Sequence, residues 1–214
     1  MSRNNNKIVP TPAIKRMPYY LAYVKGLKKK GEEYVSSKMI ADYMHIDPSQ
    51  ITKDLSYTEI IGKTRVGYQV DSFIEILTDF LSFNITNKAF LVGAGSLGSA
   101  LLHDKGISNY GLIIDTAFDT DVDKVGKEIN NIKIEHMDQF RHLAEEKEVE
   151  IGIITTPVDV AQAVADLMVA WGIKAIWNFT PTKLQVHEGI IVEHTTMYSN
   201  IASLLNKLKN ENNN

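Results

Sequence analysis

The stretch AFLVGAGSLGSAL, residues 89–101, is a short apolar run that breaks into glycines and then takes on the composition of a helix. Residues 88–92 predict a buried strand, and residues 97–103 predict a helix. Between the two, a strand–turn–helix context surrounds the pattern G-x-G-x-x-G, which is typical of a dinucleotide-binding turn. The first glycine permits a tight turn, the second lets the backbone approach a pyrophosphate, and the third lets the helix pack on the strand. We therefore expect this loop and the start of its helix to bind phosphates through Gly93, Ala94, Gly95, Ser96, Leu97 and Gly98.

A second strand is predicted over residues 112–118, and Asp119 stands at its end, 21 residues after Gly98. An acid in this position can accept hydrogen bonds from both hydroxyls of a ribose and would repel a 2′-phosphate, which favours NAD over NADP. Asp115 is the competing acid, but it falls in the middle of the strand. Asp121 and Asp123 are expected at the solvated start of a following helix.

The rest of the chain continues this alternation of strands and helices. Strands are predicted over 132–134, 151–155, 175–179 and 190–192, and helices over 138–147 and 159–171. This pattern predicts a Rossmann-like α/β fold with a doubly wound parallel sheet, over residues 85–214. Ligands bind beyond the carboxyl ends of such strands, where we expect Thr156, Pro157 and Asn178. The alternative is that these three residues form ordinary turns.

More than eighty residues precede the glycine loop, and residues 1–84 predict a separate domain. A helix is expected from Met17 to Lys30. In SSKMIADYMHIDPSQITKDLSY, residues 36–57, a serine and then Asp47-Pro48 can begin two short helices joined by a tight turn, a helix-turn-helix. The segment GKTRVGYQV, residues 62–70, predicts a basic hairpin, and residues 71–83 another helix. A helix-turn-helix followed by a basic hairpin is a winged helix.

Charge is distributed unevenly between the two parts. Residues 1–68 carry 12 Lys and Arg against 6 Asp and Glu, whereas the remainder carries 11 against 20. A basic first third favours binding of a polyanion, and with the helix-turn-helix it favours DNA. The residues expected at the DNA are Ser36, Ser37, Lys38, Gln50, Thr52, Lys53, Ser56, Tyr57, Lys63 and Arg65. The alternative is a small helical bundle that packs on the second domain and touches no DNA.

Several function classes are disfavoured. The chain has no cysteine, which excludes disulfides, thiolate metal sites and cysteine nucleophiles. It has no apolar run long enough to span a membrane and no signal-peptide pattern at its start, so a cytoplasmic location is expected. No segment remains for a substrate domain, the histidines are scattered, and no metal site is expected. Tyr34 and Lys38 match Y-x-x-x-K but precede the glycine loop, so we interpret the site as a sensor rather than a reaction centre.

The last predicted helix, residues 197–209, carries an apolar stripe: Met197, Ile201, Leu204, Leu205 and Leu208. The predicted sheet is already complete without this helix. We expect a partner subunit to cover the stripe.

Nearly the whole chain resembles the Rex family of bacterial redox-sensing transcriptional repressors. The resemblance rests on AIKRMPYYL (13–21), VSSKMIAD (35–42), QITKDLSY (50–57), VGY (66–68), LVGAGSLG (91–98), FDTDVDKVG (118–126), IGIITTP (151–157) and WNFTP (177–181). It implies a homodimer with exchanged C-terminal helices, binding to a pseudo-palindromic operator when NAD⁺ prevails, and release of the DNA by NADH. It also implies that Met197 lies near the cofactor and that Arg16 belongs to a network at the nicotinamide.

The chain departs from the pattern of the family at several positions. Thr52 stands where the recognition helix usually carries Arg, and residues 58–61 replace an aromatic-glycine stretch. Arg65 replaces the wing glycine. Near the nicotinamide, Asp104 replaces a Tyr and Thr196 replaces an Asp, and we hypothesise that Asp104 takes over as the acid of that network.

An alternative from another class is an NAD- or coenzyme A-binding enzyme or ligase subunit, since a related fold binds coenzyme A in ligases through a similar glycine loop. That alternative leaves the winged helix unexplained.

Overall fold

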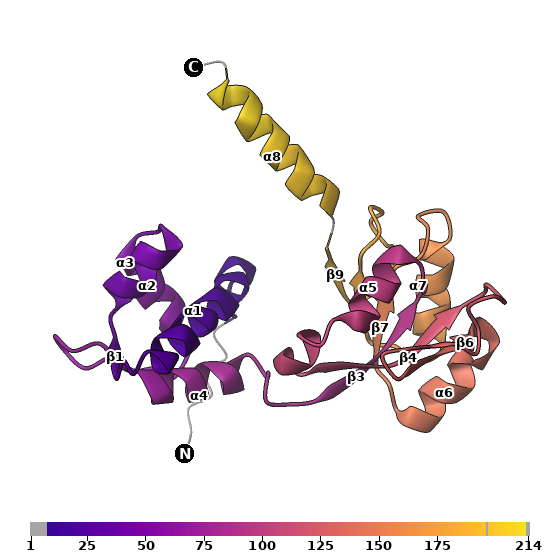
Figure 1. The fold of residues 1–214 in the computed structure, drawn as a ribbon, viewed down its shortest axis with the longest axis horizontal. Coiled ribbons are helices and arrows are strands. Elements are labelled where there is room, and N and C mark those ends of the chain that lie inside the picture. Colours follow the sequence, from indigo (N-terminus) through magenta and orange to yellow (C-terminus); the bar gives the residue numbers. More distant parts are fainter. Residues whose placement is uncertain (1–7, 196, 213–214) are drawn as a thin grey trace. The chain divides into compact units, whose positions relative to one another are not determined.

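The computed structural model describes residues 8–195 and 197–212. The chain divides into two compact units, one ending at Ile85 and the other beginning at Thr86 (Figure 1). Thr196, one of the departures noted above, lies outside the described residues. The two units are described separately below.

The first unit is built on the long helix α1, Thr11–Lys29, which packs against α4, Val70–Phe80. α1 begins six residues earlier than the sequence pattern predicts and continues through Pro18. A proline inside a helix removes one backbone hydrogen bond. Here the burial of residues on both sides of the ring compensates for that loss: Ala13, Met17, Tyr20, Leu21, Val24 and Leu27 all lie in the core of the unit.

The predicted helix-turn-helix is present as α2, Ser37–Met44, and α3, Pro48–Leu55. Ser36 begins α2 by accepting a hydrogen bond from the backbone N–H of Met39 at 3.1 Å. Asp47 begins α3 in the same way, accepting from the N–H of Ser49 at 2.8 Å. His45 makes the turn between the helices with a φ of 53°, a left-handed conformation that few residues other than glycine and asparagine favour.

The wing is shorter than the predicted hairpin. Its tip is a tight loop closed by two hydrogen bonds between Lys63 and Gly67, and the strand that follows, β2 (Tyr68–Gln69), pairs with β1 (Tyr34–Val35). A side chain at Gly67 would lie 2.5 Å from the carbonyl oxygen of Val35, so only glycine fits there. Arg65, at the tip, has a φ of 64°, in the region that favours glycine.

The second unit contains a seven-stranded sheet in the order β5-β6-β4-β3-β7-β8-β9. Its strands are β3 (Asn87–Val92), β4 (Leu112–Asp119), β5 (Glu128–Ile129), β6 (Ile132–His136), β7 (Ile151–Ile154), β8 (Ala175–Asn178) and β9 (Ile191–His194). All pairs are parallel except the β5–β6 hairpin at the edge. The order reverses direction between β3 and β7, which is where a doubly wound sheet binds its ligands.

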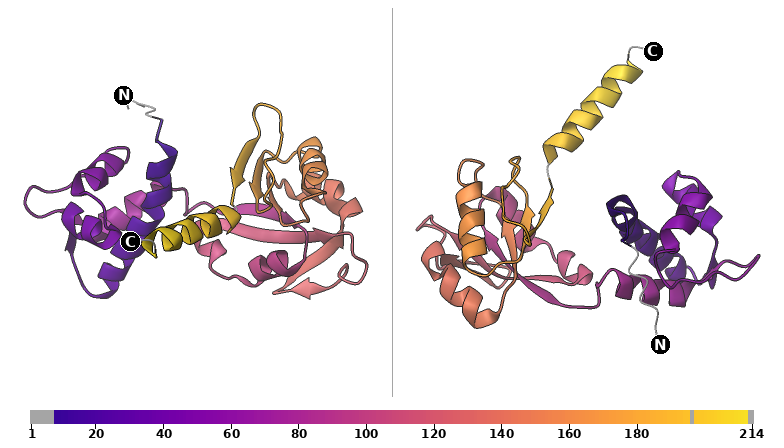
Figure 2. Two further views of the ribbon diagram at one scale, coloured as in Figure 1. Left: turned by 90° about the horizontal axis from the view of Figure 1, so that it is seen from above. Right: turned by 180° about the vertical axis from the view of Figure 1, so that it is seen from behind.

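Helices cover both faces of this sheet, as the two views of Figure 2 show. Because side chains alternate across a strand, Phe90 and Phe118 join one core with α6 (Phe140–Lys147) and α7 (Ala161–Ala170). On the other face, Leu91 and Ala117 pack with Leu102 of α5 (Ser96–His103). The chain therefore has the expected Rossmann-like architecture.

One expected helix is absent from the described residues. Between β4 and β6 the chain forms turns and then β5, so the expectation that Asp121 and Asp123 begin a helix is wrong. Their carboxylates instead close successive turns: Asp119 accepts from the N–H of Asp121, and Asp121 accepts from the N–H of Asp123, each at 2.9 Å. These bonds offer the backbone an alternative to helix formation.

The C-terminal helix α8 spans Met197–Glu211, and none of its described side chains is buried. The apolar stripe of this helix is exposed to solvent in the single chain. Its residues are all at least half exposed: Met197, Ile201, Leu204, Leu205 and Leu208. Across the described residues, no helix is both long and apolar enough to cross a membrane.

Candidate functional site

The glycine loop is held by contacts that exclude side chains at two positions. Gly93 has a φ of 101°, and a Cβ there would lie 2.8 Å from the carbonyl carbon of Thr155. A Cβ on Gly98 would lie 2.0 Å from the carbonyl oxygen of Gly93. The first turn of α5 is thus pressed against the end of β3. Gly95, in contrast, faces open space, since nothing lies within 4 Å of its Cβ position.

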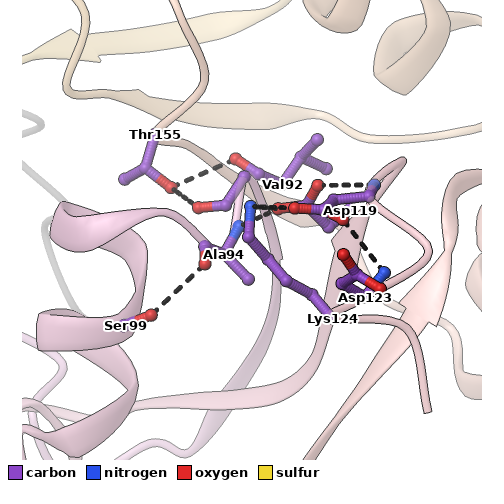
Figure 3. Close-up of polar contacts among 9 residues, drawn as sticks. Val92, Ala94, Ser99, Asp119, Asp123, Lys124 and Thr155 are labelled. Atoms are coloured by element: carbon purple, nitrogen blue, oxygen red, sulfur yellow. Dashed lines mark hydrogen bonds and ion pairs between the residues drawn. The ribbon is translucent and has the colours of Figure 1, made fainter. Parts of the chain in front are cut away.

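Hydrogen bonds from neighbouring strands define the shape of this loop. The hydroxyl of Thr155 donates to the carbonyl oxygens of Val92 and Gly93, at 3.1 and 2.8 Å (Figure 3). The N–H of Ala94 donates to Asp119 at 2.9 Å and so is committed within the protein. The beginning of α5 has no side-chain cap, which leaves the N–H groups of its first turn to attract an anion.

A cavity of about 420 Å³ opens beside this loop at the carboxyl ends of the strands. It is lined by Val92, Gly93, Gly95, Asp119, Thr120, Lys124, Met137, Thr155, Thr156, Pro157, Val160 and Val164. The hydroxyl of Thr156 is buried and lacks a hydrogen-bond partner, a condition shared among the described residues only with Thr78. A hydroxyl in the wall of a cavity that has no partner in the protein is available to a ligand or to water.

Asp119 lines this cavity, and it forms an ion pair there with Lys124. The ammonium group of Lys124 lies 3.0 Å from the carboxylate of Asp119 (Figure 3). It lies 3.4 Å from that of Asp121. Burial raises the pKa of Asp119, but hydrogen bonds from the N–H of Asp121, from Lys124 and from Ala94 outweigh burial, so the pKa lies below its usual range. Asp119 is therefore ionised at neutral pH.

Lys124 is the charged residue of the cavity that sequence reasoning missed. It stands five positions after Asp119, within FDTDVDKVG, and the expected helix would have carried it away from the acid. Its pairing with Asp119 raises its own pKa above the usual range. The turn that replaces the helix brings its cation back onto the end of β4.

The competing acid Asp115 and the expected residue Asn178 contact other side chains and do not line this cavity. Asp115, the competing acid, forms an ion pair with Lys147 at 2.6 Å and does not line the cavity. Asn178 is fully buried, and its amide contacts Thr180, Thr182 and His194. It shapes the end of β8 from beneath the surface.

Of the residues expected at the nicotinamide, Asp104 does not line this cavity. Asp104 ends α5, where its carboxylate accepts from the N–H of Gly106 at 2.6 Å, and it lines a different, mainly apolar cavity. Met197 is the first residue of α8. Arg16 belongs to the first unit, where it pairs with Asp54 through two hydrogen bonds of 2.7 and 2.8 Å.

A larger cavity, about 500 Å³, lies at the amino ends of β3, β7 and β8. Its walls include lysines and glutamates that pair with one another, as Lys174 does with Glu150. Since ligands bind at the opposite edge in this fold, we assign no ligand to it.

In the first unit, five of the residues expected at DNA surround one shallow groove between the start of α2 and the wing: Ser36, Ser37, Lys38, Lys63 and Arg65. On α3, Thr52 and Lys53 are exposed and Gln50 is half-buried; directly after the helix, Ser56 is exposed and Tyr57 is half-buried. Lys63 lies 5.6 Å from the centre of the ring of Tyr34, within the range of a cation–π interaction. Among these ten residues, four side chains are basic (Lys38, Lys53, Lys63 and Arg65) and none is acidic.

Each of the two units matches a model of a known protein family. Residues 8–56 match the family model for a putative DNA-binding protein N-terminus, and residues 84–182 match that for a CoA binding domain. The redox-sensing transcriptional repressor Rex of Bacteroides fragilis is 52% identical over 94% of this chain and 91% of its own length. That of Treponema denticola is 41% identical over 92% and 94%. The chain belongs to the Rex family. It is thus a redox-sensing transcriptional repressor by family, not a member of an enzyme family.

Solved structures agree with this assignment. A structure described as RSP, a Rex-family repressor, is 30% identical, with a TM-score of 0.86 over 96% of this chain and 97% of its own. RSP in complex with beta-NAD+ and operator DNA has a TM-score of 0.90 at 30% identity, over 96% and 95%. The Rex fold therefore extends over both units of this chain.

The ion pair between Lys124 and Asp119 predicts a change in titration. Replacement of Lys124 by Met should raise the pKa of Asp119 towards its ordinary value of about 3.9, because the cation that favours the carboxylate is gone. A depressed pKa adds stability that is present above the ordinary value and is lost as pH falls through the depressed one. The variant should therefore lose part of this stability at neutral pH.

Carbon-13 NMR titration of the aspartate carboxyls measures this pKa directly. Lys127→Met, in the same segment but outside the cavity lining, is the control. An unchanged Asp119 pKa in Lys124→Met would contradict the assigned pairing.

Proposed function

We propose that this protein binds NAD(H) in the cavity beside the glycine loop and binds operator DNA through α3 and the wing, and that the reduced cofactor releases the DNA. The observation that carries the proposal is the joint placement of an ionised acid, a glycine loop and an uncapped helix start around one cavity. A dinucleotide needs these three groups for its ribose and its pyrophosphate. RSP is a structural relative that was solved with beta-NADH and with beta-NAD+ and operator DNA.

The residues present fit such a cofactor. The open space above Gly95 admits a pyrophosphate, and the first turn of α5 offers its N–H groups to the phosphate oxygens. The hydroxyl of Thr156, unsatisfied in the protein, is available to a polar group of the ligand. The bound cofactor supplies the redox state that is sensed. The protein supplies binding and orientation.

The choice between NAD and NADP depends on two opposite charges. Asp119 repels a 2′-phosphate, whereas Lys124 attracts one. With Asp121 included, two acids face one base at this end of β4, so the net charge still favours NAD. The preference is therefore smaller than Asp119 alone would produce.

The charge balance gives a prediction for nucleotide preference. Asp119→Ala should narrow the preference for NADH over NADPH by on the order of one to a few kcal/mol, because the repulsion of the 2′-phosphate is removed. Lys124→Ala should widen it, since the attraction is removed, and Lys127→Ala should leave it unchanged. Fluorescence titrations with the two nucleotides measure the ratio. Equal affinity of the unmutated protein for both would contradict the assignment of the ribose site.

A second ligand class follows from the match to the CoA binding domain model over residues 84–182. Coenzyme A carries a phosphate at the 3′ position of its ribose, which Asp119 also repels. We therefore favour NAD(H). Displacement of bound NADH by coenzyme A at equal concentration would favour the alternative.

For DNA binding, the helix-turn-helix places α3 as the recognition helix and the basic loop as the wing. Lys53 is exposed on α3, and Lys63 and Arg65 are exposed on the wing. These three cations provide contacts to phosphates, while the polar residues of α3 face the bases. A DNA-binding role is also consistent with a cytoplasmic location.

Loss of these cations should reduce the salt dependence of DNA binding. Lys53→Ala and Lys63→Ala should each weaken binding and lower the slope of log affinity against log salt concentration by about 1 per phosphate contact in each subunit. Anisotropy titrations of a labelled duplex at several salt concentrations measure the slope. Lys207→Ala, on α8, is the control. Unchanged affinity and slope in both variants would show that this surface does not bind DNA.

We also infer that the active form is a homodimer in which α8 packs on the partner subunit. A two-fold operator needs two copies of α3, and the exposed stripe of α8 needs an apolar surface. We also propose that the two subunits exchange these helices. Such packing would place Met197 near a cofactor, as the resemblance implies.

A charge on the stripe of α8 should disrupt the dimer. Leu204→Glu, combined with Leu208→Glu, should shift the protein to the monomer, because burial of a carboxylate in an apolar contact is costly. Ser203→Glu, on the other side of the helix, should have no effect. Sedimentation velocity distinguishes the two states. A dimer that persists in the double variant would exclude α8 from the interface.

A further inference from the structure

A single buried carboxylate joins the recognition helix to the rest of the first unit. Asp54, in the last turn of α3, is 1% exposed and accepts four hydrogen bonds. Arg16 provides two of them, at 2.7 and 2.8 Å, and the hydroxyl of Tyr20 provides the third, at 2.7 Å. Both donors come from α1. The pairing therefore fixes the orientation of α3 against α1.

The fourth bond comes from the recognition helix itself. The amide nitrogen of Gln50 donates to Asp54 at 2.7 Å, one helical turn away. Gln50 is the third residue of α3 and is only half-buried, whereas Asp54 is buried. Residues near the start of a recognition helix are those that contact base edges. The buried acid thus holds a side chain that stands where bases are contacted.

This bond decides which way the amide faces. An ionised carboxylate only accepts hydrogen bonds, so the nitrogen of Gln50, not its oxygen, must face Asp54. Asp54 is ionised because the bonds from Arg16, Tyr20 and Gln50 outweigh the effect of burial and hold its pKa below the usual range. The hydrogen bonds among the described residues then use one N–H of Gln50 and leave its Oε1 and its second N–H for another molecule.

An acceptor and a donor side by side on a glutamine amide match one base edge. Adenine presents an N6 donor and an N7 acceptor in the major groove, and Gln pairs with both at once. No other single base presents both a donor and an acceptor on its own major-groove edge. The remaining polar atoms of Gln50 are therefore arranged for adenine before any DNA is bound.

We propose that Gln50 recognises an adenine in each half of the operator, and that Asp54 is the positioning residue that presents its amide. This inference rests on the proposed DNA-binding function. Asp54 itself touches no base. Arg16 and Tyr20 act one step further away, by keeping the carboxylate of Asp54 ionised and in place. Burial, together with the hydrogen bond to Asp54, raises the pKa of Tyr20 to about 12, so this hydroxyl remains a donor.

The test is selection from a duplex library with a randomised core, followed by competition binding of the selected duplex and of its single base-pair variants. The unmutated protein should select an adenine in each half-site. Gln50→Ala, whose side chain is half exposed, should bind the selected duplex about tenfold more weakly and lose most of the preference at that base pair, as expected for one bidentate contact. The slope of its log affinity against log salt concentration should not change, because Gln50 contacts no phosphate in this proposal. Gln139→Ala, an exposed glutamine of the second unit, is the matched control.

The role of Asp54 is tested in a double-mutant cycle. Asp54→Asn should relax the preference at the same base pair when Gln50 is present and should have no further effect on that preference in the Gln50→Ala background. A role limited to stability would weaken binding to all duplexes equally. Tyr20→Phe, which removes one bond to Asp54 and keeps the ring, should give a smaller change of the same kind and serves if Asp54→Asn does not fold.

The outcomes separate the inference from the function on which it rests. If the unmutated protein enriches no duplex, both fail. If it enriches a duplex but Gln50→Ala keeps every base preference, DNA binding stands and the assignment of Gln50 is overturned. If Gln50→Ala loses the adenine preference but both Asp54→Asn and Tyr20→Phe retain it, Gln50 reads the base without the help of Asp54, and the positioning role is overturned.

Discussion

Gly93 and Gly98 approach each other so closely that a single methyl group on Gly98 would lie 2.0 Å from the Gly93 carbonyl oxygen. This contact seats the first turn of α5 directly on the end of β3, and Thr155 secures it from β7. Because the helix begins there, its N–H groups face the cavity, and Asp119 reaches the loop from the next strand through Ala94. The position of the acid, the shape of the cavity and the access of an anion all depend on that approach.

The first unit has a comparable constraint of a different chemical kind. Burial of an ionised acid is costly unless its charge is paired and its lone pairs are satisfied. Asp54 meets this condition with donors from α1 and α3. The benefit is orientation more than stability, since apolar contacts such as those of Ile51 and Leu55 already hold α3 to the core. A buried ion pair of this kind fixes the direction in which a recognition helix is presented to DNA.

Local patterns predicted the elements well where local chemistry decides them. The caps at Ser36 and Asp47, the glycine loop and the acid after β4 are each set by residues close in sequence. The prediction of a helix after Asp119 was wrong, because aspartates close turns as readily as they begin helices. For the same reason the pairing of Lys124 with Asp119 was not predicted. The Arg16–Asp54 pair joins residues 38 positions apart, a distance at which periodicity carries no signal. Asp104 closes its own turn through a bond to the N–H of Gly106, and its place in the network of Arg16 stays a prediction.

In this protein, one chain couples the redox state of its cofactor to its affinity for DNA. A ligand can shift this equilibrium only by its differential affinity for the two states, so NADH and NAD⁺ must differ in their effect. The most direct measurement is the affinity of the full-length protein for its selected duplex with saturating NADH, with saturating NAD⁺ and without cofactor. We expect DNA binding to be weaker with NADH than with NAD⁺ by about 5–150-fold, as is usual for such coupling. Identical DNA affinity with the two cofactors would contradict it.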